Sequence, residues 1–258
     1  MTPPPTPSAP LARGRFLVLE GIDGSGKTSQ FDALASWLPG SGLLPPGAGL
    51  IRTREPGGTP LGRELRTLLL HPPEEAAPCS DAELLLYAAD RAQHVRTLIQ
   101  PALQAGHWVL SDRFSGSTAA YQGYGRGLPL ERIATLERIA TGGLEADLTL
   151  WLDLPLELSL QRRGNRSSDR IEAAGAVFLE RVAAGFQALA RERGWRRIDA
   201  SAPLPEVSLC CREAIASLMA TGGAEAPSAG GDPGPSASPA SPIGPAGEEP
   251  GSGGLGDG

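Results

Sequence analysis

Short apolar runs alternate along the chain with longer segments in which apolar residues recur at three- and four-residue spacing. The short runs predict β-strands, and the longer segments predict amphipathic helices. We expect the strands at residues 16–20, 50–53, 107–112, 148–153 and 196–199. Alternation of this kind is typical of a parallel sheet with crossover helices on both faces. Because ligands bind such sheets beyond the carboxyl ends of the strands, candidate chemistry should lie there.

The two ends of the chain lack this pattern. Residues 1–13 have no basic segment followed by a long apolar run, so they do not resemble a secretory signal. From Gly222 onward the chain is almost entirely Gly, Pro, Ala, Ser and acids, which cannot bury enough apolar surface to offset the ordering entropy. We therefore expect a disordered extension over residues 1–13, one α/β domain over 14–220 and a disordered acidic tail over 221–258. We favour a solvated tail over a partner-binding arm.

Charge is concentrated in the tail. The formal net charge is −6, and beyond Met219 there is no basic residue. The acids of the tail are Glu225, Asp232, Glu248, Glu249 and Asp257. The domain is then nearly neutral, without the basic footprint of a nucleic-acid-binding protein or a polybasic membrane patch. The three cysteines do not make a disulfide framework, and no apolar run reaches the roughly 20 residues that span a bilayer. We expect a cytoplasmic protein with neither nucleic-acid nor membrane partners.

The first predicted strand runs into a glycine-rich turn in the stretch FLVLEGIDGSGKTSQ. Residues 21–28 fit G-x-x-x-x-G-K-[ST] between a strand and a helix, which is typical of an ATP-binding P-loop. The backbone N–H groups of such a loop and the positive end of the next helix hold phosphates. Lys27, the only lysine, would reach the β- and γ-phosphates, and Thr28 would ligate Mg²⁺. The expected ATP-binding residues are Gly21, Ile22, Asp23, Gly24, Ser25, Gly26, Lys27 and Thr28.

Asp23 stands inside this loop, where a carboxylate beside polyphosphate is electrostatically unfavourable. It therefore needs a partner. A ligand hydroxyl and Mg²⁺ are both candidates, and a side chain turned out to solvent is the remaining alternative.

Further polar clusters follow other predicted strands. Arg54 lies at the end of the second strand, and Asp112 and Arg113 lie at the end of the third. Two arginines from separate strand ends can bind a phosphate dianion through bidentate hydrogen bonds. Tyr87 and Arg91 are four residues apart on a predicted helix, so they share one face and could bind a base. Surface ion pairs for the arginines and a core position for the tyrosine are the alternatives.

Five segments resemble, in order, the motifs of thymidylate kinases. They are LEGIDGSGKT, TREPGGTPLG, LLYAADRAQH, SDRFSGSTAAYQGYGRG and DRIE. The resemblance runs from about residue 15 to 215 and implies a P-loop kinase fold with a central five-stranded parallel sheet and a small lid. It also implies transfer of the γ-phosphoryl group of ATP to dTMP, giving dTDP and ADP, with Mg²⁺ as cofactor. Family members are homodimers, so we expect one here, with apolar residues of 83–103 as a candidate interface.

The resemblance implies roles at single positions of the phosphate and sugar sites. Asp23 would accept a hydrogen bond from the deoxyribose 3′-hydroxyl. Arg54 and Arg113 would hold the dTMP phosphate, with Asp112 near Mg²⁺. Thymine would stack on Tyr87, where the family usually has phenylalanine.

Other positions are implied for the base pocket. Arg91 would bond to the base edge, and Thr118 would lie beside the base. Tyr121 would lie against the sugar and disfavour a 2′-hydroxyl. Ser117 and Gln122 are expected to belong to the same substrate pocket.

The run QRRGNRSSDRIE resembles the lid of the family, at about residues 162–171. Arginines there would stabilise the charge on the transferring phosphoryl group and help to exclude water. Relatives of the eukaryotic kind carry an arginine directly after the P-loop aspartate, whereas this chain has Gly24. We therefore expect a lid arginine to act, with Arg166 favoured over Arg163 and Arg170. The expected catalytic residues are Lys27, Arg113, Arg166 and Arg163.

Three other functions compete with this one. The chain could phosphorylate another pyrimidine monophosphate such as dUMP. A regulatory GTPase is nearly excluded, because guanine selection through N-K-x-D needs a second lysine. An inactive scaffold is disfavoured by the intact set of Asp23, Lys27, Thr28 and Arg113.

Overall fold

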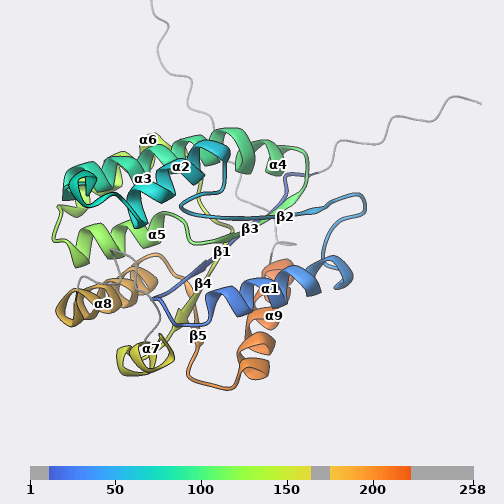
Figure 1. Ribbon diagram of the computed structural model, residues 1–258. Coiled ribbons are helices and arrows are strands. Elements are labelled where there is room, and N and C mark those ends of the chain that lie inside the picture. The colour runs from blue at the N-terminus through green and yellow to red at the C-terminus, as the bar shows by residue number, and fades with distance from the viewer. Residues whose placement is uncertain (1–11, 164–174, 222–258) are drawn as a thin grey trace, which may run out of the picture. The chain divides into compact units, whose positions relative to one another are not determined.

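The computed structural model describes residues 12–163 and 175–221. Its sheet has five strands, all paired in parallel, in the order β2-β3-β1-β4-β5 (Figure 1). The strands are β1 (Phe16–Glu20), β2 (Leu50–Arg54), β3 (Trp108–Asp112), β4 (Leu148–Asp153) and β5 (Arg196–Asp199). The predicted five-stranded parallel sheet is confirmed, with each boundary within one residue of its expected position.

Helices and short turns connect these strands. The α-helices are α1 (Lys27–Trp37), α2 (Pro60–Leu70), α3 (Ser80–His94), α4 (Gln100–Gln104), α5 (Ser115–Thr118), α6 (Leu130–Thr141), α7 (Leu156–Arg163), α8 (Ala176–Glu192) and α9 (Leu204–Thr221). The shorter segments are the 3₁₀ turns η1 (Leu38–Gly40) and η2 (Glu74–Ala76) and the π-helical segments η3 (Val95–Ile99) and η4 (Ala119–Gly125).

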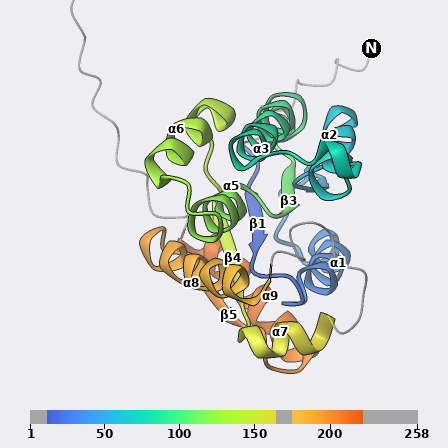
Figure 2. The same ribbon diagram turned by 60° about the vertical axis from the view of Figure 1, so that its left-hand side comes forward.

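Both faces of the sheet are covered, because successive side chains of each strand point to opposite sides. In β1, Phe16 and Val18 join a buried cluster with Ile99 of η3. The alternate residues Leu17 and Leu19 join the larger cluster that includes Leu34 of α1. Figure 1 shows α1 beside α9, and Figure 2 separates α1 from α5, α6 and α8 on the other side of β1. The core therefore lies in two layers, one on each face of the sheet.

The strand register brings three carboxyl ends together. Asp112 at the end of β3 pairs with Leu19 of β1 on one side and with Arg54 of β2 on the other. The loops that leave these strands carry the P-loop, the segment before α2 and the segment before α5. This edge of the sheet is where the candidate residues gather.

Several expectations lie wholly or partly outside the described residues. Arg166 and Arg170 belong to residues 164–174, as does most of the expected lid. The N-terminal extension, apart from residues 12 and 13, and the tail from residue 222 onward are outside them as well. Arg162 and Arg163, at the start of the expected lid, form the end of α7.

Candidate active site

The P-loop turns directly from β1 into α1. Gly24 and Gly26 have φ angles of 79° and 88°, in the left-handed region that favours glycine. A Cβ added to Gly24 would lie 2.9 Å from the carbonyl oxygen of Ser159, because α7 approaches the loop here. The backbone at Gly24 therefore suits glycine and disfavours an arginine at this position.

Lys27 folds back over the P-loop. Its Nζ donates to the carbonyl oxygens of Gly21 and Ile22, at 3.0 and 2.8 Å. Burial, followed by the nearby Arg113, lowers the pKa of the Lys27 ammonium to about 8. An anionic ligand in this loop would favour the charged form and raise that pKa. The Lys27 ammonium therefore lies against the backbone of the P-loop.

Asp23 has partners within the protein. Tyr121 donates from its hydroxyl to Asp23 Oδ2 at 2.8 Å, and Arg113 forms a short hydrogen-bonded ion pair with Oδ1. Burial opposes ionisation, but the charges of Arg113 and Lys27 outweigh it and lower the pKa of Asp23 well below its usual value. Arg113 was expected to bind phosphate, and its pairing with Asp23 was not predicted from the sequence.

Arg113 follows β3 in an unusual conformation. Its φ of 73° is the only positive value among the non-glycine residues that the structure describes, and such residues concentrate at functional sites. Its Nη1 donates to the carbonyl oxygen of Gly21 at 3.0 Å and to Ser117 Oγ at 2.9 Å. The guanidinium also stacks over the Tyr121 ring, 5.3 Å from its centroid. Arg113 thus connects the P-loop to α5 and η4.

Glu20 holds the start of α5 against β1. It is buried and accepts hydrogen bonds from the backbone N–H groups of Phe114 and Ser117, both at 3.0 Å, and from Ser117 Oγ at 2.6 Å. Burial raises the pKa of this carboxyl, partly opposed by the Arg113 charge. The sequence did not single out Glu20, since it reads as the last residue of a strand.

A cavity opens between α2, α3 and η4, next to the Asp23–Arg113 pair. Its lining residues are Asp23, Glu55, Pro56, Arg66, Leu70, Tyr87, Arg91, Arg113, Phe114, Ser117, Thr118, Tyr121 and Gln122. All the substrate-pocket residues expected from the sequence except Arg54 belong to this lining. We call this space the acceptor cavity.

Arg91 is fixed in the wall of the acceptor cavity. It is 2% exposed, and its Nε donates to Glu55 Oε2 at 2.9 Å. Its Nη2 donates to the carbonyl oxygen of Phe114 at 3.2 Å and to Thr118 Oγ1 at 2.9 Å. The other oxygen of Glu55 lies 2.9 Å from His94 Nδ1. These hydrogen bonds use Nε and Nη2 of Arg91 and do not involve Nη1.

A second groove runs along the P-loop on the other side of the Asp23–Arg113 pair. Its lining residues are Asp23, Gly24, Ser25, Gly26, Lys27, Thr28, Ser29, Gln30, Arg54, Glu55, Arg66, Asp112, Arg113, Arg162, Arg163, Ala200, Ala202, Leu204 and Val207. We call it the P-loop groove. Asp112 Oδ1 is buried without a hydrogen-bond partner among the described residues. No group of three or more His, Cys, Asp or Glu side chains in the described part of the chain could hold a metal by itself.

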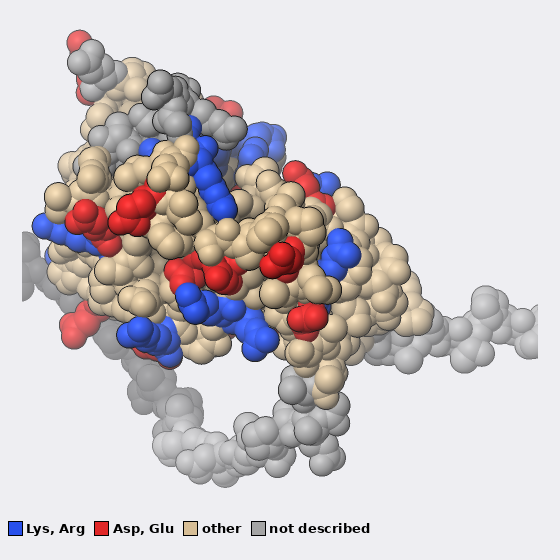
Figure 3. Space-filling model, turned by 90° about the horizontal axis from the view of Figure 1, so that it is seen from below, with Lys and Arg blue, Asp and Glu red and all other residues tan. Residues whose placement is uncertain are grey.

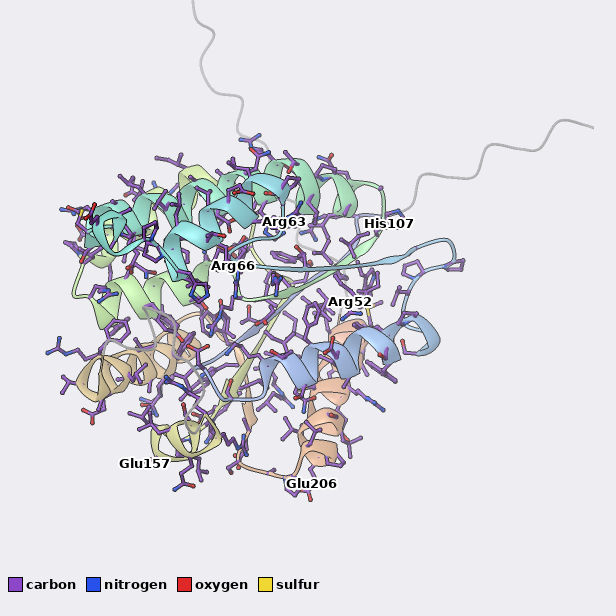
Figure 4. All side chains as sticks on the ribbon, in the orientation of Figure 1. Arg52, Arg63, Arg66, His107, Glu157 and Glu206 are labelled. Atoms are coloured by element: carbon purple, nitrogen blue, oxygen red, sulfur yellow. The ribbon has the colours of Figure 1, made fainter. Side chains whose placement is uncertain are left out.

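Arg66 was missed in the sequence. It lines both the acceptor cavity and the P-loop groove, and its Nη1 donates to the carbonyl oxygen of Pro56 at 3.0 Å. Its spacing in α2 could have indicated this position. Arg66 lies four residues after Gly62 and three before Leu69, so it shares a helix face with two buried residues. Arg52 lies elsewhere, beside α1, where it pairs with Asp32 (Figure 4).

One face of the molecule carries charges of both signs. In the view of Figure 3, basic and acidic side chains of the described surface are interspersed. Among the described residues, no helix is long and apolar enough to cross a membrane.

Comparisons with known proteins agree on one family. Residues 19–209 match the family model described as thymidylate kinase. A thymidylate kinase of Synechococcus sp. (strain RCC307) is 67% identical over 195 residues, which are 76% of this chain and 92% of that protein. One from Prochlorococcus marinus (strain MIT 9313) is 67% identical over 195 residues, 76% of this chain and 90% of the other. The crystal structure of a thymidylate kinase from Ehrlichia chaffeensis matches with a TM-score of 0.62 and 30% identity, covering 79% of this chain and 99% of that one.

Proposed function

Because this chain belongs to the thymidylate kinase family, we propose that it transfers the γ-phosphoryl group of ATP to dTMP, giving dTDP and ADP. One observation carries the assignment of the two substrates to their sites. The P-loop groove and the acceptor cavity adjoin, and both are lined by Asp23, Arg113, Glu55 and Arg66. Two phosphorylated substrates bound there would bring their phosphates together at this shared wall.

ATP would bind in the P-loop groove. The backbone N–H groups after Gly21 and the start of α1 suit its phosphates. Lys27 would exchange its two carbonyl partners for phosphate oxygens, since a charge-assisted hydrogen bond to an anion is stronger than one to a neutral carbonyl. Ser25 Oγ, which is buried without a hydrogen-bond partner among the described residues, would gain one there.

dTMP would bind in the acceptor cavity. Tyr87 would supply a π-face for thymine, and Arg91 Nη1 would donate to the base edge. Tyr121 and Asp23 would meet the sugar. Arg113 and Arg66 would hold the acceptor phosphate, with Arg54 contributing from the P-loop groove.

Transfer needs position and charge more than a general base. An oxygen of the acceptor phosphate forms a bond to the γ-phosphorus while the bond from that phosphorus to the bridging oxygen of ADP breaks. The acceptor is already anionic, so it needs no base to remove a proton. Lys27 and Arg113 stabilise the transferring group, together with arginines at the end of α7 and beyond. Arg163 lines the P-loop groove, whereas Arg166 lies outside the described residues.

The P-loop groove also fits a magnesium ion. Thr28 and Asp112 both line it, and the unpartnered Asp112 Oδ1 offers the hard oxygen that Mg²⁺ prefers. Mg²⁺ held through few protein ligands and the phosphates would neutralise phosphate charge when bound.

We further propose a cytoplasmic homodimer. Cys79, Cys210 and Cys211 are free thiols, which fits a reducing compartment. Large apolar side chains are exposed on α2, α3 and α6, three helices that pack side by side. They are Leu61, Leu68, Leu85, Leu130 and Ile139, and we call them the α2–α3–α6 face. A second copy of the chain would cover it.

An acceptor panel tests the proposed reaction. ADP formation from ATP and Mg²⁺ is measured with dTMP, dUMP, CMP, AMP and GMP in turn. We expect dTMP to give the highest kcat/KM, with dUMP well below it. Absence of dTMP-dependent ADP formation would overturn the proposal, and equal turnover of dUMP would assign a broader pyrimidine kinase.

A further inference from the structure

Gln122 of η4 carries a side-chain amide and lies in the wall of the acceptor cavity. It is 1% exposed and belongs to the lining of that cavity. Its Nε2 donates to Oε1 of Glu83 at 2.7 Å. An amide has a donor end and an acceptor end, so the end that meets the cavity decides which base edge fits it.

Glu83 lies behind Gln122 in the first turn of α3. It is 0% exposed and is not among the residues that line the acceptor cavity. Arg126 donates from Nε and Nη2 to its two oxygens, at 3.4 and 3.3 Å. The Arg126 guanidinium is itself stacked over Phe178, 4.9 Å from the ring centroid. Glu83 is therefore a buried carboxylate that is held by Arg126 and contacts Gln122, a residue of the cavity wall.

This arrangement fixes the orientation of the Gln122 amide. A carboxylate accepts hydrogen bonds and donates none, so it bonds to the NH₂ group and repels the amide oxygen. A flipped Gln122 would place two acceptors against each other in a buried site, which is unfavourable. With an Nε2 hydrogen bonded to Glu83, the carbonyl oxygen is the opposite end of the amide and would be available to accept from a ligand in the cavity.

We propose that Glu83 is a positioning residue that restricts the acceptor to pyrimidines with an imide N–H, by turning the Gln122 carbonyl toward the base. The inference rests on the proposed dTMP kinase activity and deepens it. Thymine and uracil carry an N3–H donor beside the O4 acceptor, whereas cytosine carries an N3 acceptor beside a 4-amino donor. A pocket with the Gln122 oxygen as acceptor and Arg91 as donor matches the first pattern and opposes the second.

The variant Glu83→Gln tests this role. It exchanges the carboxylate for an amide of the same size, whose NH₂ can donate to the Gln122 oxygen and so permits the flip. We expect the ratio of kcat/KM for dTMP over dCMP to fall by at least about tenfold, mainly through KM. The ratio for dTMP over dUMP should stay within about twofold, since both bases carry the imide. Glu83→Asp, which keeps the carboxylate, should retain more of the discrimination against dCMP than Glu83→Gln.

A matched control separates this effect from the loss of a buried charge. Asp147 is another largely buried acid, which pairs with Arg13 and Arg15 at 3.0 and 3.1 Å and does not line the acceptor cavity. Asp147→Asn should change neither ratio. If Glu83→Gln does not fold, the double variant Glu83→Gln/Arg126→Gln removes the arginine left without its partner and serves the same comparison.

Two results would overturn the proposal. One is an unchanged dTMP to dCMP ratio in a folded Glu83→Gln enzyme. The other is an equal loss of activity with all three acceptors and a lower melting temperature, which would make Glu83 purely structural. If the wild-type chain forms no ADP with dTMP, the proposed function fails instead. Calorimetric affinities for dTMP, dUMP and dCMP then still test Glu83 on the same variants.

Discussion

Buried charges around the acceptor cavity are arranged in a network that positions Arg91. Glu55 bonds to Arg91 through one oxygen and to His94 through the other. His94 Nε2 lies 2.6 Å from Thr53 Oγ1, so the network reaches back to β2. Asp90 is next to this network and less well satisfied. Its Oδ1 accepts from the Gly57 N–H at 3.2 Å, but its buried Oδ2 has no hydrogen-bond partner in the described part of the chain.

We predict that Asp90→Asn stabilises the protein at alkaline pH. Burial and the Glu55 charge raise the pKa of Asp90 from 3.8 to about 6. The pKa of Asp90 is higher in the folded protein than in the unfolded chain, so the protonated carboxyl favours the folded state. This stability is fully present below about pH 4 and is lost as the pH rises through about 6. Two pKa units correspond to about 3 kcal/mol, and the asparagine oxygen can still accept from Gly57. We expect the variant to gain about 1–3 kcal/mol in the free energy of unfolding at pH 8 and almost nothing at pH 4, measured by urea denaturation.

The control for this prediction is Glu157→Gln. Glu157 is an exposed acid on α7, away from the network (Figure 4). This variant should show no pH-dependent gain. A gain for Asp90→Asn of the same size at pH 4 and pH 8 would contradict the ionisation argument.

At this scale the sequence predicts the residues that belong to a motif and misses those that act through another residue. Lys27 stands in a motif whose chemistry can be derived from spacing, whereas the roles expected of Asp23 and Arg113 came from the resemblance to a known family. Glu55 and Glu83 are ordinary acids in sequence, and their importance depends on neighbours more than 30 residues away, at 36 and 39 positions. Such contacts are set by the packing of α3 against the segments around it, which periodicity does not specify.

The P-loop and α7 are in close contact at the site. Ser159 Oγ donates to the carbonyl oxygen of Asp23 at 2.6 Å. The neighbouring Gly24 lies so near α7 that an added Cβ would meet the Ser159 backbone. The end of α7 carries Arg162 and Arg163 into the P-loop groove. Glycine at position 24 thus allows α7 to bring arginines to the loop.

We predict that Gly24→Ala lowers kcat/KM for ATP by at least about tenfold. The added methyl group must push α7 or the P-loop aside, and small displacements of phosphate-binding groups strongly reduce phosphoryl transfer. Gly127→Ala is a matched control, because Gly127 has the same φ of 79° but no atom within 4 Å of its added Cβ. Both variants should lose about 1–2 kcal/mol of stability from backbone strain. Steady-state kinetics should change only in Gly24→Ala, and equal kinetics of the two variants would refute close approach as the cause.

Element prediction succeeded for the strands, whereas the dimer interface expected along residues 83–103 stays a prediction. The strands β1, β3 and β4 are short and mainly apolar, so pattern alone located them, whereas β5 has Ile198 as its single apolar residue. The segment 83–103 was expected to carry apolar residues in excess of one helix face. In the structure Val95, Ile99 and Leu103 are buried in the cluster against β1 and β3. The π-helical η3 lies in this segment, and only Leu85 of its large hydrophobic residues is exposed.

The whole domain leaves the α2–α3–α6 face uncovered. Its exposed side chains include Leu85 at 56% and Ile139 at 70% exposure. These helices lie on the side of the sheet opposite α1 and α9 (Figures 1 and 2). The central helix of the three, α3, also carries Tyr87 and Arg91 into the wall of the acceptor cavity. A second copy on this face would therefore support the helix that carries the proposed base-binding residues.

We predict that Leu85→Glu converts a dimer to a monomer. Each dimer would bury two such carboxylates in an apolar contact, which is strongly unfavourable, so the dissociation constant should rise by at least about 100-fold. Leu209→Glu on α9 is the matched control, because Leu209 is also 56% exposed but belongs to the opposite side of the sheet. Light scattering after size exclusion should give about twice the chain mass of 26.7 kDa for the wild type and for Leu209→Glu. A single chain mass is expected for Leu85→Glu. If Leu85→Glu stays dimeric while Leu209→Glu dissociates, the interface lies on the α9 side instead.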